Sequence, residues 1–425
     1  MRGFGQAGLG GREHICAGAT FDLATHLYTL DPKLRSIPVL LEARYNEEVQ
    51  TRRKLRTSHG SCRSEAREKG LAVTTQKRPV IAIDGRLGLR WPRNGIGEYV
   101  YRLIVELGFL SRPYDIKVFG DSSADPEVAR RIRFLFPVEL VLTPSPALWD
   151  LTAFPQAVKG SALLHGAGGI VPWASRIPRI LTVHSAITRR ALKRASVVLT
   201  LSEALKEAMA NAAGIAGERV VLTPPAPAIA PASHTDDAVR ETYLLAEAGD
   251  HAESLRWALQ LFGEHARHDS GLRLRIIVTD PQRESVARRL VQAYRPISAH
   301  IDFVVPQSPD DLALLYKRAA IVLADGQGVE SVITRLNGYA AATPVIAQSR
   351  QTNDALPGEE NLAFWLDTAN AAEGAQRVHA ILENPVVAQE RLDRARTLAR
   401  SYTWKKTAEL THQAYLSILQ NLQGL

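Results

Sequence analysis

The residues best placed to do chemistry lie in "GVESVITRLNGYAAATPVIA", residues 328–347. The stretch is typical of a loop, a helix and a buried strand, with a carboxylate at Glu330 and an amide at Asn337. A carboxylate at a helix start can accept hydrogen bonds from sugar hydroxyls, while the first-turn amides can hold a phosphate. Asn337 follows about two turns later and shares that face. Plain helix packing would explain the same letters, so both interpretations stay open.

A second candidate is "GIGEYV", in which Gly95 and Gly97 flank Ile96 between an apolar run and a helix. Glycines at a helix start let backbone amides approach an anion at the positive end of the helix dipole. Ordinary turn glycines would give the same pattern.

Two histidines each end an apolar run, His165 in "LLHGAGG" and His184 in "LTVHS". The end of a strand is where a general base or a substrate-binding group would lie. A buried histidine satisfied by backbone groups is the alternative, and residue type alone favours it. The sequence has no H-E-x-x-H motif, no paired Cys/His spacing and no acidic calcium loop, so no metal site is predicted.

From Pro79 onward, short β-branched runs alternate with amphipathic stretches, which predicts βαβ units and parallel sheets. A proline-rich stretch interrupts this alternation once. We therefore predict an α/β protein of two doubly wound, Rossmann-like domains facing across a cleft, with ligands at the carboxyl ends of the strands. The expected boundaries are 79–223 for the first domain, 224–240 for the linker, 241–400 for the second domain and 401–425 for a C-terminal helix that packs back on the first domain.

The first 78 residues differ from the rest of the chain. They hold 14 Lys/Arg against 8 Asp/Glu, which leaves 38 against 36 for the remainder, and they contain both cysteines, Cys16 and Cys62. Since they show no sustained period of 2 or 3.6, we predict a mostly disordered extension, or translation from a start codon set too far upstream. A basic arm that touches anionic lipid or RNA is the alternative.

Composition limits the remaining possibilities. A length of 425 residues favours two domains, and 45% apolar residues is typical of a globular protein. No run of 18 apolar residues is present, and charged residues interrupt the only candidate signal region, so a spanning helix and a secretory signal are not predicted. Because the main body has no cysteine, a cytoplasmic location is the default.

The chain resembles glycosyltransferase family 4, whose enzymes have the GT-B fold, and its motifs occur in the same order as in that family. The resemblance covers residues 79–421 and rests on the segments "IAIDGRLGLRWPRNGIGEYVYRLIVEL", "ILTVHS", "SPDDLALLYKRAAIVLADG" and "GYAAATPVIA". It implies transfer of a sugar from a UDP- or GDP-linked donor to a glycan or lipid-linked acceptor, with retention of anomeric configuration. The implied setting is cell-surface polysaccharide biosynthesis in the cytoplasm, with peripheral contact at the inner membrane face. Neither a cofactor, a metal nor a nucleic acid is implied.

The resemblance also implies roles for individual residues. His184 and Glu330 would be catalytic, and His165 and Ile96 would lie on the acceptor side, in the first domain. The residues implied to bind the donor are Gly95, Gly97, Ser331, Arg335 and Asn337.

The chain departs from the family pattern at the donor site. The motif E-x7-E is replaced by E-x6-N, and the stretch "AEAGDHAESL" has no Arg or Lys before Arg256, where the family supplies two cations for the diphosphate. Arg335 and Arg283 are the candidates to replace them. A catalytically degenerate protein that serves as a binding or partner subunit is therefore the alternative to an active transferase.

Overall fold

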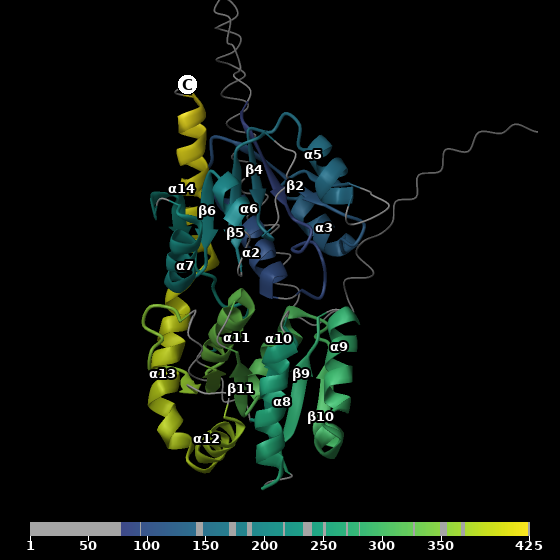
Figure 1. The fold of residues 1–425 in the computed structure, drawn as a ribbon, viewed down its shortest axis with the longest axis vertical. Coiled ribbons are helices and arrows are strands. Elements are labelled where there is room, and N and C mark those ends of the chain that lie inside the picture. The colour runs from purple at the N-terminus through teal and green to yellow at the C-terminus, as the bar shows by residue number, and fades with distance from the viewer. Residues whose placement is uncertain are drawn as a thin grey trace, which may run out of the picture. The chain divides into compact units, whose positions relative to one another are not determined.

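The computed structural model describes residues 78–93, 95–141, 148–169, 176–184, 189–215, 217–232, 240–249, 252–268, 271–279, 281–325, 328–348, 355–366 and 370–423 (Figure 1). Residues Arg78–Leu425 form one compact unit. The predicted extension covers residues 1–78, and its residues 1–77, with Cys16 and Cys62, lie outside the described residues.

Within the described residues the first sheet has seven strands, in the order β3-β2-β1-β4-β5-β6-β7, and every pairing is parallel. The sheet order changes direction after β1, as in a doubly wound fold. Its strands are β1 (Val80–Asp84), β2 (Asp115–Gly120), β3 (Val138–Leu140), β4 (Leu163–Gly166), β5 (Arg179–Val183), β6 (Val197–Thr200) and β7 (Val220–Leu222).

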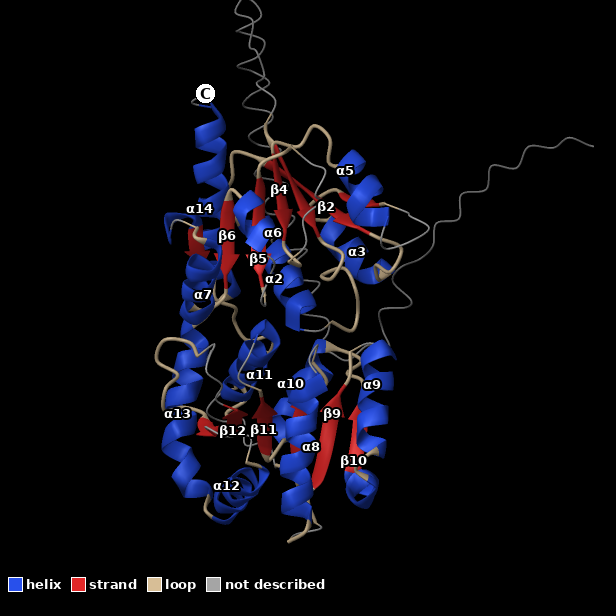
Figure 2. Ribbon diagram, viewed as in Figure 1, coloured by secondary structure: helices blue, strands red, loops and turns tan. Residues whose placement is uncertain are grey.

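Helices cover this sheet (Figure 2). Apolar residues of the first helix recur at helical spacing and are fully buried, which explains why it packs on the sheet (Tyr99, Val100, Leu103, Ile104 and Leu107). The helices are α2 (Gly95–Phe109), α3 (Pro126–Arg133), α5 (Phe154–Ala157), α6 (Arg189–Arg194) and α7 (Glu203–Ala213), with the π-helical turn η2 (Trp149–Ala153) and the 3-10 turn η3 (Gly217–Arg219).

The second sheet has six strands in the described residues, again all parallel, in the order β10-β9-β8-β11-β12-β13. The two sheets confirm the predicted fold class. The strands are β8 (Tyr243–Glu247), β9 (Arg273–Ile277), β10 (Ile301–Val304), β11 (Ile321–Ala324), β12 (Val345–Gln348) and β13 (Phe364–Leu366).

Helix α10 (Pro309–Arg318) begins with a serine cap and a first-turn proline. Ser308 accepts a hydrogen bond from the Asp311 amide at 3.1 Å, and Pro309 occupies the first turn of α10. The helices are α8 (Ala252–Ala266), α9 (Pro281–Gln292), the 3-10 turn η4 (Arg295–His300), α10 (Pro309–Arg318), α11 (Gly328–Ala340), α12 (Ala371–Glu383), α13 (Pro385–Ser401) and α14 (Trp404–Gln423).

The last helix, α14, packs against α2 of the first half. Tyr415 and Ile418 are buried in the core of the first sheet, and the Trp404 indole Nε1 donates to the Pro227 carbonyl at 2.8 Å. The proline-rich stretch is held as well, because the Arg102 guanidinium donates to the Ala228 carbonyl at 2.7 Å. Buried contacts therefore hold both segments that connect the two halves, the proline-rich stretch and α14.

Candidate functional site

Helix α11 begins beside the carboxyl end of β5. Gly328 has a φ of 79°, a left-handed conformation that favours glycine. A Cβ at Gly328 would lie 3.7 Å from the His184 carbonyl oxygen. The start of α11 and one of the two strand-end histidines are therefore neighbours, as a site at the strand ends requires.

Two glycines enclose the Glu330 side chain. A Cβ at Gly95 would lie 2.7 Å from the Glu330 Cα, and a Cβ at Gly249 would lie 2.8 Å from the Glu330 Oε2. Both distances are shorter than van der Waals contact. At Gly95 the obstacle is backbone, so a side chain has no space there, whereas at Gly249 the Glu330 carboxylate would have to shift. The close approach of α2 and α11 thus explains by packing why a glycine stands at position 95. The role of Gly95 in donor binding stays a prediction.

The Glu330 carboxylate has a cationic partner. Arg283, in the first turn of α9, places its Nη1 3.0 Å from the Glu330 Oε1 and 3.4 Å from the Ala248 carbonyl oxygen. Both charged side chains are about six-sevenths buried, with exposures of 14% for Arg283 and 15% for Glu330. The pair joins α9, the end of β8 and the start of α11.

A second carboxylate lies near this pair, and the sequence analysis missed it. Glu247 ends β8, is partly buried and accepts a hydrogen bond from the Tyr316 hydroxyl. Desolvation, and then the Glu330 charge, raise its pKa to about 7. The signal was in the sequence, since Glu247 is an acid at the carboxyl end of a buried strand, which is the ligand-binding edge of such a sheet.

Asn337 and Arg335, both predicted to bind the donor, are buried and engaged within the protein. The Asn337 Oδ1 accepts a hydrogen bond from the Ala228 amide at 2.7 Å. Arg335 has 0% exposure and donates to the Glu359 Oε1 at 2.6 Å and to the Ser331 hydroxyl at 2.8 Å. These contacts make all three α11 side chains, Ser331 included, parts of the packing between α11 and its neighbours, and no described contact supports their predicted role.

His184 is buried next to α2. Its Nε2 lies 2.6 Å from the Ala167 carbonyl, so Nε2 carries the proton and donates. The Nδ1 is therefore an acceptor, and it has no hydrogen-bond partner among the described residues. Burial lowers the His184 pKa to about 4, which keeps the ring neutral at pH 7. A neutral imidazole with an open acceptor can bind a hydroxyl group.

His165 lies in the core of the first half. Its two ring nitrogens are hydrogen-bonded to the Tyr415 hydroxyl at 2.6 Å and the Thr182 hydroxyl at 2.8 Å. Burial lowers its pKa to about 3. Both ring nitrogens are thus occupied. The alternative interpretation of the sequence, a buried histidine satisfied within the protein, therefore fits His165, but its partners are hydroxyl groups and not backbone groups.

The remaining predicted residues lie in the first turn of α2. Gly97 is buried, and Ile96 is partly buried against the core of the first half. Their predicted roles in binding stay predictions.

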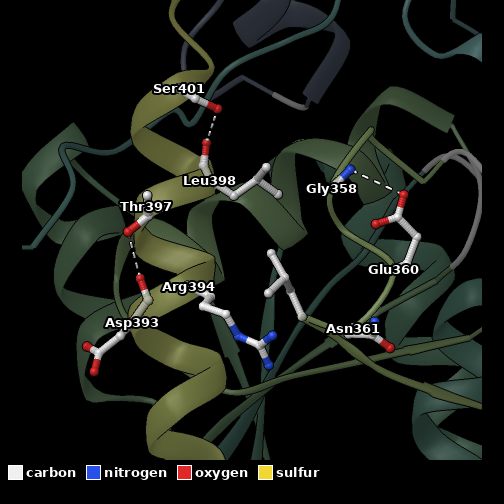
Figure 3. Close-up of a pocket in the computed structure, with 9 residues that line it drawn as sticks. Gly358, Glu360, Asn361, Asp393, Arg394, Thr397, Leu398 and Ser401 are labelled. Carbon is white, nitrogen blue, oxygen red and sulfur yellow. Dashed lines mark hydrogen bonds between the residues drawn. The ribbon is translucent and has the colours of Figure 1, made fainter.

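A surface cavity of about 520 Å³ lies elsewhere, between α13 and the segment before β13 (Figure 3). Arg394 and Asn361 line it together with the hydroxyl-bearing residues Thr397 and Ser401. None of its lining residues belongs to the Glu330 site. In the described part of the chain, no group of three or more His, Cys, Asp or Glu residues is arranged to hold a metal ion. No described helix is both long and apolar enough to cross a membrane.

No protein-family model matches the chain, and no curated protein matches it in sequence. Solved structures do match. A sucrose-phosphate synthase from Thermosynechococcus elongatus has a TM-score of 0.61 at 17% identity, covering 81% of this chain and 100% of that chain. The fold is GT-B.

Two further GT-B structures cover the same part of the chain. Anabaena Alr3699/HepE, solved in complex with UDP and glucose, has a TM-score of 0.59 at 14% identity, covering 82% of this chain and all of its own. A glycosyltransferase from Rickettsia africae has a TM-score of 0.57 at 13% identity, with coverage of 81% and 100%. At these identities the likeness establishes the GT-B fold alone.

Proposed function

We propose that this protein is a glycosyltransferase that moves a sugar from a nucleotide diphosphate donor to a glycan or lipid-linked acceptor. The observation that carries the proposal is the GT-B fold, which covers the full length of neighbours such as HepE, solved with UDP and glucose. We further propose a retaining, family-4-like reaction in cell-surface polysaccharide assembly, at the cytoplasmic face of the membrane. The nucleotide sugar is a co-substrate, and the proposed reaction uses no cofactor.

The described residues support this proposal at one edge of each sheet. His184 directly follows β5 and has an acceptor nitrogen, Nδ1, while the Arg283 guanidinium, paired with Glu330, lies beside the first turn of α11. A helix start with a nearby guanidinium favours an anionic group. A neutral imidazole suits a sugar hydroxyl. Both donor parts, the diphosphate and the sugar, therefore have groups of matching chemistry.

A second candidate function is that of a binding or partner subunit without catalytic activity. The specific observation in its favour is the pair of carboxylates, Glu247 and Glu330, close to where the family supplies two cations. Acidic groups at that position oppose a diphosphate, because like charges repel strongly where water is partly excluded.

Nucleotide binding separates the two functions. The full chain is melted with UDP, GDP, UDP-glucose and GDP-mannose at millimolar concentration. A ligand at 100 times its Kd adds about 2.7 kcal/mol to the free energy of unfolding. A rise in Tm with one nucleotide, together with release of that nucleotide from its sugar donor, supports the transferase. No shift with any of the four would contradict it and favour the partner subunit.

A further inference from the structure

The sequence offers two arginines, Arg283 and Arg335, to replace the missing cations. The structure distinguishes between them, because their side chains differ in exposure. Arg335 is fully enclosed, and both its Nε and its Nη2 bond to Glu359, which is itself 0% exposed. Arg283 keeps 14% of its side chain exposed, at the strand-end edge of the second sheet. Of the two arginines, Arg283 is therefore the one whose side chain is partly accessible to a ligand.

Whether Arg283 can bind a ligand also depends on the carboxylate with which it is paired, that of Glu330. Glu330 lies in the first turn of α11, where its Cα closely approaches Gly95 of α2. Arg283 extends from a different helix, α9, and its Nη1 lies 3.0 Å from the Glu330 Oε1. An ion pair between side chains of two helices can exchange its anion when a more strongly charged anion binds the guanidinium.

We propose that Arg283 binds the donor diphosphate and that Glu330 is its counter-ion in the ligand-free protein, which the diphosphate replaces. The inference rests on the proposed function, since it names the group that holds the donor. A diphosphate carries more negative charge than one carboxylate and offers several acceptor oxygens to a planar guanidinium. Glu330 is then a competitor for Arg283, which differs from the sugar-binding role that a carboxylate at the start of a helix suggests.

The two roles of Glu330 predict opposite results for a charge-neutral variant. In Glu330→Gln the amide oxygen can still accept a hydrogen bond from Arg283, but the negative charge is lost. If Glu330 competes with the diphosphate, UDP or GDP binds this variant more tightly, by roughly fivefold, the size expected for a weak ion pair. If Glu330 holds the sugar, the variant leaves nucleotide affinity unchanged and weakens binding of the nucleotide sugar.

The experiment measures Kd by calorimetry for UDP, GDP, uridine and guanosine in five proteins: the wild type, Arg283→Ala, Arg283→Lys, Glu330→Gln and the double variant Arg283→Ala/Glu330→Gln. We expect Arg283→Ala to weaken the nucleotide by roughly tenfold to a hundredfold and to leave its nucleoside unchanged, because a charge-assisted hydrogen bond is lost. Arg283→Lys should recover part of the loss. The double variant should match Arg283→Ala alone, since the competitor has no effect without the cation.

Arg288→Ala is the matched control, because Arg288 lies on the same helix α9, is more than half exposed and pairs with Glu284. It should bind the nucleotide as the wild type does. An unchanged nucleotide affinity in Arg283→Ala, or an unchanged or weaker affinity in Glu330→Gln, would overturn the exchange while leaving the transferase proposal intact. A wild-type protein that binds neither UDP nor GDP would overturn both.

Discussion

At the scale of single residues, Glu247 has the most unusual environment in the site. Its pKa of about 7 lies well above its ordinary value of 4.5, because its carboxyl group is desolvated and the Glu330 charge is nearby. Between these two pH values the folded protein keeps a proton that the unfolded chain has lost. The free energy of unfolding therefore loses a contribution as the pH rises from 4.5 to 7.

Glu247→Gln should remove this pH dependence. The amide keeps an oxygen that accepts from the Tyr316 hydroxyl, but it has no proton to lose. We expect the stability of the variant, relative to the wild type, to increase by on the order of 2 kcal/mol between pH 5 and pH 8. Urea unfolding at the two pH values measures the difference. Glu253→Gln, with a side chain 63% exposed, is the control, and an equal change in both variants would contradict the assigned environment.

At the scale of elements, the buried pair of Arg335 and Glu359 fastens the segment before β13 to α11. Glu359 accepts from Arg335, from the Tyr339 hydroxyl at 2.8 Å and from the Leu356 amide at 2.8 Å. Removing one member leaves an uncompensated buried charge, so we expect Glu359→Ala to cost about 3 to 5 kcal/mol of unfolding free energy. Urea unfolding measures this cost.

The double variant Arg335→Met/Glu359→Leu provides the matched comparison. Two apolar side chains of similar size leave no buried charge, so most of the lost stability should return. A double variant as unstable as Glu359→Ala would show that the buried charge is not the cause of the lost stability. The packing of the segment before β13 would then be the larger contribution.

The same elements show what the sequence could and could not predict. Alternating apolar runs and caps such as Ser308 and Ser202 depend on near neighbours, and the strands and helix starts follow from them. The environments of site residues depend on distant partners. Asn337 bonds to Ala228, 109 residues earlier, and Glu247 to Tyr316, 69 residues later. Such partners meet only after the sheets form, so the family resemblance suggested donor binding for side chains, such as Asn337 and Arg335, that the structure buries.

At the scale of the whole molecule, His165, His184 and Glu247 contribute from two domains to the pH dependence of stability near neutrality. His165 and His184 have pKa values of about 3 and about 4, below their ordinary value of 6.5. As the pH falls through 6.5, the unfolded chain takes up two protons that the folded protein does not. Glu247 acts in the opposite sense, because between pH 4.5 and 7 the folded protein holds one proton more at this residue than the unfolded chain does.

The three groups together give a quantitative prediction. Between about pH 5 and pH 6 these three groups give the unfolded wild-type chain a net of one extra proton, so their contribution to stability should fall on acidification with a limiting slope of about 1.4 kcal/mol per pH unit. His412, whose pKa is also lowered by desolvation, adds to this fall. Above pH 7 the curve should be nearly flat. In Glu247→Gln the compensating proton is absent, so the acid slope should be steeper than that of the wild type by up to about 1.4 kcal/mol per pH unit. Urea unfolding at half-unit steps from pH 5 to pH 8 measures both slopes. Equal slopes in the two proteins would show that the histidines of the first domain and the carboxyl group of the second do not oppose each other in this way.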